Sequence, residues 1–167
     1  MTTGLFDSID DAIAAIARGD VVVVADDEDR ENEGNLIMAA DTSTEDQLAF
    51  FVRHTSGVIC VGLTDERCDE LDLALMVPPG ADQESQGTAF TISVDLKSGT
   101  STGISAADRA RTLRALADAN IDSHGSLDAQ WPGCSAKSSS TPGAWPASLT
   151  CASSPTDMVS CSCRSPT

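Results

Sequence analysis

Two apolar segments, Val21 to Ala25 and Leu36 to Ala40, flank a short and densely charged stretch of the chain. Between them, the run from Asp26 to Gly34 holds six carboxylates and one guanidinium within nine residues. The flanking segments have the length and the apolar character of strands. The sequence therefore predicts a strand, an acid-rich turn and a second strand, with the carboxylates held at a fixed edge of a sheet.

This acidic run is a candidate metal site. Its carboxylates repel one another unless a divalent cation, a cationic partner or bulk water offsets the repulsion. Glu31 and Glu33 offer hard oxygen ligands, which suit magnesium or manganese. Arg30 lies within the same run and carries the planar donor fork that binds phosphate or carboxylate groups. The alternative interpretation is a charged loop that is simply solvated.

Helical and strand patterns alternate along the first two thirds of the chain. Residues that favour helix N-termini precede four helical patterns: Ser8, Thr44, Thr64 and Ser105. Apolar strand patterns lie between them at residues 21–25, 36–40, 58–63 and 90–94. This alternation predicts one layered α/β domain over residues 1–119, with enough apolar residues to bury a core.

The regular pattern stops at about residue 119. Residues 120–167 hold twelve serines, four of the six cysteines and five of the seven prolines, but three of the 26 acidic residues. Because no helical or strand periodicity continues there, this segment is predicted to be an irregular or disordered tail.

The charge of the chain excludes two classes of partner. Its formal net charge is −16, whereas nucleic acids and anionic membranes are bound by clustered lysine and arginine. No basic N-terminal segment precedes an apolar stretch, and no apolar run approaches the ~18 residues of a membrane span. We therefore expect a soluble, cytoplasmic protein whose cysteines are reduced.

Four motifs, taken together, resemble one enzyme family. They are the acidic run, Arg53-His54-Thr55-Ser56-Gly57, Gly87-Thr88-Ala89-Phe90-Thr91, and the segment from Thr102-Gly103 to Asp108-Arg109. Over roughly residues 5–118 the chain closely resembles the 3,4-dihydroxy-2-butanone 4-phosphate synthases. The resemblance implies a layered α/β sandwich, incomplete here at its C-terminal end, and a homodimer with sites at the subunit interface. It also implies conversion of the sugar phosphate D-ribulose 5-phosphate to L-3,4-dihydroxy-2-butanone 4-phosphate and formate in riboflavin biosynthesis, with Mg²⁺ or Mn²⁺.

The resemblance also assigns roles to residues. It implies that Glu31 is a metal ligand, that Arg30 and Glu31 contact the sugar phosphate, and that Glu33 acts as base or further ligand. Asn35 stands where the family's acidic loop usually carries an aspartate that contacts substrate. Thr102 and Gly103 precede a helix, where hydroxyl and amide groups can receive a phosphate. The alternative for these two residues is a turn that leads into the helix.

Part of the family pattern is missing from this chain. The family's Pro-Gly-His and Gly-His-Thr-Glu segments, which supply a catalytic histidine and the second metal ligand, have no counterpart, and His124-Gly125 is not that motif. The alternative function is therefore an inactive remnant that lacks the histidine ligand and the catalytic histidine and glutamate.

The composition of the tail fits a shifted reading frame. If the frame has slipped so that the first base of each present codon was the middle base of the intended one, codons for serine, cysteine and tryptophan mostly become codons for apolar residues. Read back in this way from Trp131 onward, the tail can contain the family's Ala-Gly-Val-Leu-x-Glu and Met-Ala-Arg-Leu-Pro stretches. We therefore expect a frameshift and an internal deletion near residues 119–130, which sequencing of the gene would test.

A zinc module is a third interpretation of the tail. Its candidate ligands are His124, Cys134, Cys151, Cys161 and Cys163. Cys161-x-Cys163 is a single close pair without a C-x-x-C partner, so the spacing supports zinc poorly.

Overall fold

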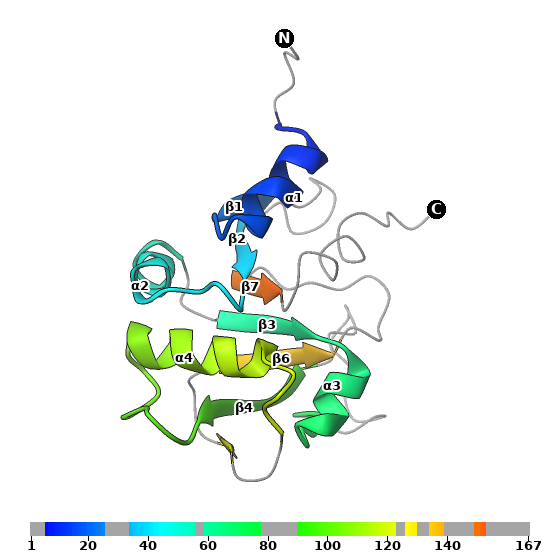
Figure 1. The fold of residues 1–167 in the computed structure, drawn as a ribbon, viewed down its shortest axis with the longest axis vertical. Coiled ribbons are helices and arrows are strands. Elements are labelled where there is room, and N and C mark those ends of the chain that lie inside the picture. Colours follow the sequence, from blue (N-terminus) through cyan, green and yellow to red (C-terminus); the bar gives the residue numbers. More distant parts are fainter. Residues whose placement is uncertain are drawn as a thin grey trace.

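The computed structural model describes residues 6–25, 34–55, 59–77, 90–122, 126–129, 134–138 and 149–152 of the chain. In chain order the elements are α1 (Ile9–Ala17), β1 (Val22–Ala25), β2 (Gly34–Ala39), α2 (Glu45–His54), β3 (Ile59–Leu63), α3 (Asp65–Glu70), β4 (Phe90–Leu96), α4 (Ala106–Ala117), β5 (Leu127–Ala129), β6 (Cys134–Ser138) and β7 (Leu149–Ala152). Helices pack on a mixed sheet (Figure 1), so the predicted layered α/β fold is confirmed.

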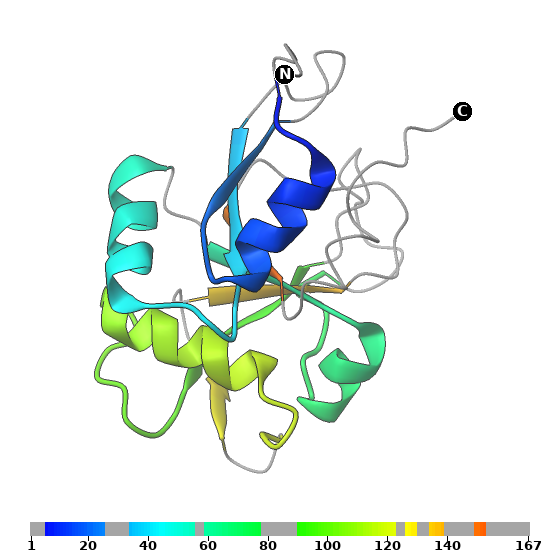
Figure 2. The same cartoon turned by 45° about the horizontal axis from the view of Figure 1, so that its top comes forward.

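The described strands form one sheet in the order β1-β2-β7-β3-β6-β4-β5. Its centre is parallel, because β7 runs parallel to both β2 and β3, and β6 runs parallel to β3. Its two sides are antiparallel, with β1 against β2 at one side and β4 between β6 and β5 at the other. Figure 1 shows α4 lying across β6 and β4, whereas Figure 2 shows α1 against the β1–β2 hairpin.

The helices begin where the cap residues predict. In each case the cap side chain accepts a hydrogen bond from the backbone amide three residues on, which satisfies an otherwise unpaired donor. At Thr44 the capping is reciprocal, because the Thr44 amide also donates to the Gln47 side-chain oxygen at 3.0 Å. The two contacts form a capping box. None of the described helices is long and apolar enough to cross a membrane.

The core lies between α2, α4 and the centre of the sheet. Leu48 and Phe51 of α2 and Leu113 and Leu116 of α4 are fully buried. They belong to one cluster with Val61 of β3 and with further apolar side chains of β2, β3 and β4. The apolar stripes of the two helices therefore cover one face of the sheet.

Three segments of the predicted irregular tail form strands in the structure. Residues 127–129, 134–138 and 149–152 form β5, β6 and β7, and β6 and β7 pair with β3 on either side. The physical reason is that strand pairing is made by backbone groups, and buried strands such as β3 need partners for their amides and carbonyls on both edges. The division at residue 119 and the shifted frame remain predictions, and the zinc interpretation depends on residues 124, 161 and 163, which lie outside the described ranges.

Candidate functional site

The ends of the acidic run are held together, although the run itself, residues 26–33, lies outside the described residues. Arg30, Glu31 and Glu33 belong to that stretch. Ala25 at the end of β1 pairs with Gly34 at the start of β2, so the predicted strand, turn and strand form an antiparallel hairpin. The hairpin fixes both ends of the acidic run at one edge of the sheet, as the sequence predicts.

Asn35 and Thr102 are the two predicted site residues that the structure describes. Asn35 lies in β2, opposite Val24, and is partly buried. Thr102 is exposed in the turn between β4 and α4. Three strands separate β2 from β4, and four strand spacings amount to about 19 Å. The sheet therefore separates β2, which carries Asn35, from β4, which leads into the turn that carries Thr102.

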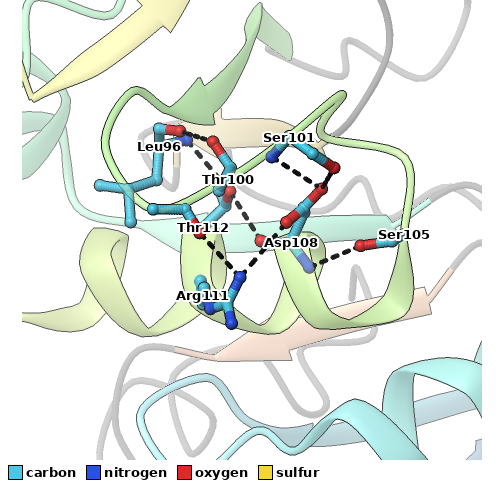
Figure 3. A network of polar contacts seen from close by, with 8 residues as sticks. Leu96, Thr100, Ser101, Ser105, Asp108, Arg111 and Thr112 are labelled. Atoms are coloured by element: carbon cyan, nitrogen blue, oxygen red, sulfur yellow. Dashed lines mark hydrogen bonds and ion pairs between the residues drawn. The ribbon is translucent and has the colours of Figure 1, made fainter.

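The turn that carries Thr102 is organised by Asp108 of α4 (Figure 3). The Asp108 carboxylate accepts hydrogen bonds from the Ser101 hydroxyl at 2.8 Å and from the Ser101 amide at 3.2 Å, and the Gly103 amide also donates to it. The hydrogen bond from the Ser101 hydroxyl is the largest cause that holds the pKa of Asp108 below its usual range. The turn is therefore tied to the first turn of α4 by an ionised carboxylate.

The start of the same turn is tied to β4. The Leu96 amide donates to the Thr112 hydroxyl at 3.1 Å, and that hydroxyl donates to the Asp108 carbonyl at 3.1 Å. Thr100 in turn donates to the Leu96 carbonyl. Figure 3 shows these contacts as one network between the end of β4 and α4. The segment that leads to Thr102 is therefore held by hydrogen bonds at its start.

Stability should depend on pH through Asp108. Because the pKa of Asp108 is lower in the folded protein than in the unfolded chain, its contribution is complete above about pH 4 and is lost as the pH falls through the folded-state pKa. We expect Asp108→Asn to be less stable than the wild type at pH 7, with a difference that shrinks below pH ~4. Urea unfolding at several pH values measures this, and a difference that stays constant on acidification would contradict it.

Asp95 is a second carboxylate at this turn, and the sequence analysis missed it. It is 7% exposed, and its Oδ1 has no hydrogen-bond partner in the part of the chain that the structure describes. Burial is the main cause that raises the pKa of Asp95; Arg109 opposes the shift and Asp108 adds to it. The available signal was a charged residue directly after the apolar strand pattern at residues 90–94.

Three other residues have ordinary structural positions. His54 is exposed at the end of α2, with its ring centroid 4.5 Å from that of Phe50. Arg109 donates its Nε to the Ile104 carbonyl at 3.0 Å. Cys60 is fully buried in β3, as expected of a small packed side chain. The described residues include no group of three or more histidine, cysteine or acidic side chains that could hold a metal ion.

Comparison with known protein sequences gives a consistent result. Residues 10–143 match the sequence model of a family described as 3,4-dihydroxy-2-butanone 4-phosphate synthase. The chain is 57% identical over 108 residues to the 3,4-dihydroxy-2-butanone 4-phosphate synthase of Agrobacterium fabrum, covering 65% of this chain and 50% of that protein. It is also 57% identical over 115 residues to the riboflavin biosynthesis protein RibBA of Nocardia farcinica, covering 69% of this chain and 27% of that protein.

Solved structures agree with the sequence matches. One is a 3,4-dihydroxy-2-butanone 4-phosphate synthase in complex with two magnesium ions, with a TM-score of 0.75, 46% identity, and coverage of 83% of this chain and 62% of that chain. Another is the synthase of Candida albicans, with a TM-score of 0.70, 41% identity, and coverage of 81% and 64%. The chain spans half or less of the two sequence relatives and less than two thirds of these solved chains.

Proposed function

The chain belongs to the 3,4-dihydroxy-2-butanone 4-phosphate synthase family, and from this membership we propose that it converts D-ribulose 5-phosphate to L-3,4-dihydroxy-2-butanone 4-phosphate and formate in riboflavin biosynthesis. The observation that carries the proposal is the family match over residues 10–143. We place the reaction in the cytoplasm. The buried cysteine Cys68 is a free thiol, which agrees with a reducing compartment.

The acidic run has the donor chemistry for a divalent metal. Carboxylate oxygens are the ligands that magnesium and manganese prefer, and the β1–β2 hairpin holds both ends of the run in place. In the proposal, Glu31 holds the metal. When bound, the metal would polarise the ketone and diol oxygens of the sugar phosphate.

The remaining roles belong to side chains around that metal ligand. Arg30 and Glu31 contact the substrate, and Asn35 does so from the second pair of the β1–β2 ladder after the run, in which it lies opposite Val24. Glu33 accepts a carbon-bound proton as general base, because a carboxylate beside a polarised ketone can take up that proton. Thr102, in the turn that leads into α4, binds the phosphate group near the N-terminus of this helix, where the helix dipole favours negative charge.

A homodimer is part of the same proposal. Asn35 lies on β2 and Thr102 lies in the turn after β4, and three strands separate β2 from β4 in the sheet, so a second copy would complete a site around either residue. β1 is an edge strand of the described sheet, and its Val23 is 71% exposed. An exposed apolar edge strand is a surface that a protein normally covers, and we propose that a second copy covers it.

Release of formate from D-ribulose 5-phosphate tests the proposal directly. We expect turnover with added magnesium, loss of turnover with a chelator, and recovery when magnesium is restored. Glu31→Gln should need roughly tenfold more magnesium for half-maximal rate, because a metal ligand has been weakened. A folded protein without magnesium-dependent formate release would favour the inactive remnant instead.

A further inference from the structure

The turn before α4 lies against the carboxylate of Asp95, one oxygen of which has no hydrogen-bond partner among the described residues. Asp95 is 7% exposed at the end of β4, and its Oδ1 is fully buried without a hydrogen-bond partner among the described residues. A buried and unpaired carboxylate oxygen lowers stability, so its presence calls for a reason. An apolar or amide side chain would fill the same place at lower cost.

Gly103 lies directly against this carboxylate. Its φ is +75°, in the left-handed region. A Cβ atom at Gly103 would lie 2.0 Å from Oδ2, 2.4 Å from Cγ and 2.8 Å from Oδ1 of Asp95. All three distances are shorter than non-bonded atoms can approach. The Asp95 carboxylate therefore occupies the space that a side chain at Gly103 would need.

Asp108 holds the same turn from α4. Its carboxylate accepts hydrogen bonds from Ser101 and from the Gly103 amide. The backbone of Gly103 is thus fixed by two carboxylates, one through packing and the other through hydrogen bonds. Thr102, which lies between Ser101 and Gly103, is exposed and has no described hydrogen bond to its hydroxyl. Thr102 is thus exposed in the turn that leads into Ser105, the N-cap of α4.

We propose that Asp95 is a positioning residue, whose carboxylate beneath Gly103 fixes the turn that presents Thr102 to a phosphate group. The phosphate part of this inference rests on the proposed function, whereas the order of the turn does not. Direct contact between Asp95 and substrate is not required, since its Oδ1 is fully buried.

Two substitutions distinguish a positioning role of Asp95 from a general contribution to folding. Asp95→Ala removes the carboxylate, whereas Asp95→Asn keeps its shape and removes its charge. Hydrogen exchange of the Gly103 amide reports the order of the turn, and titration with inorganic phosphate, followed by the amide resonances of Thr102 and Gly103, reports binding without catalysis. Asp69→Ala on α3, where Asp69 is exposed, is the matched control.

We expect Asp95→Ala to speed hydrogen exchange of the Gly103 amide about tenfold, because a less ordered turn opens more often. It should also weaken phosphate binding about tenfold, because Thr102 is then no longer held in the binding geometry. Asp95→Asn should restore both to within about threefold of the wild type, and Asp69→Ala should change neither. Unchanged exchange and affinity in Asp95→Ala would overturn the inference, as would equal losses in Asp95→Ala and Asp95→Asn. Absence of phosphate binding at the turn of the wild type would also overturn it, while failure of formate release alone would count against the proposed function and not against this role of Asp95.

Discussion

Replacing Phe51 with alanine is expected to lower the free energy of unfolding by about 4 kcal/mol. Phe51 lies on α2, is 0% exposed, and belongs to the cluster that joins α2 and α4 to the centre of the sheet. Removing its ring loses the free energy gained by burying a large apolar group. It also leaves a cavity that the packed neighbours fill only in part. Urea unfolding at pH 7 measures the loss.

The neighbouring phenylalanine provides the control for this prediction. Phe50 lies one position earlier on the same helix, but its side chain is 47% exposed and contacts the ring of His54. Phe50→Ala makes the same chemical change on the solvent side and should cost less than about 1 kcal/mol. Similar losses of stability at both positions would mean that α2 does not bury the face that carries Phe51.

Replacing Gly103 with alanine is expected to cost about 3 kcal/mol of stability, the sum of two effects. The φ of +75° is strained for any residue with a side chain. In addition, the new methyl group would meet the Asp95 carboxylate at 2.0 Å, and that carboxylate is held between β4 and the turn, so either the turn or β4 must shift. Thermal and urea unfolding should both show the loss.

Gly99 separates the two effects. It has a similar φ of +83°, but nothing lies within 4 Å of a Cβ atom at that position. Gly99→Ala should therefore carry the backbone strain alone and cost about 1 kcal/mol. Gly103→Ala should also cost less when Asp95 is already alanine, because the clash is then relieved. Equal costs at Gly99 and Gly103 would rule out the contact with Asp95.

The helix starts could be predicted because their signals are local. Thr44 and Ser105 each bond to an amide three residues on, and this contact is complete within one turn of chain. The strands that carry Val22 and Ile37 follow from apolar content in the same way. Local pattern therefore accounts for the elements up to α4.

What sequence did not predict depends on contacts between distant segments. Asp95 is buried because the turn at Gly103 lies on it, a contact that a strand pattern cannot anticipate. The polar composition of residues 134–152 concealed β6 and β7, which pair through their backbones with β3.

In the candidate site, too, features set by neighbouring residues could be predicted, whereas those set by contacts between distant segments could not. The acidic run was recognised from its density of carboxylates, and its hairpin from the two apolar segments beside it. The separation of Asn35 from Thr102 depends on strand order, and two of the three strands between them come from the end of the described chain. Motif spacing carries no information on that separation, which is why the expectation of a homodimer came from the family resemblance.

The place of β7 in the sheet has a consequence for synthesis of the protein. β2 and β3 are successive strands in the chain, yet β7 lies between them and pairs with both. When a ribosome has released β3, which ends at Leu63, the adjoining edges of β2 and β3 still await residues 149–152, about 90 residues further on. At elongation rates of about 5–20 residues per second, both edges stay open for at least several seconds. Chaperones that shield unpaired strands would have their greatest effect on the nascent chain in this interval.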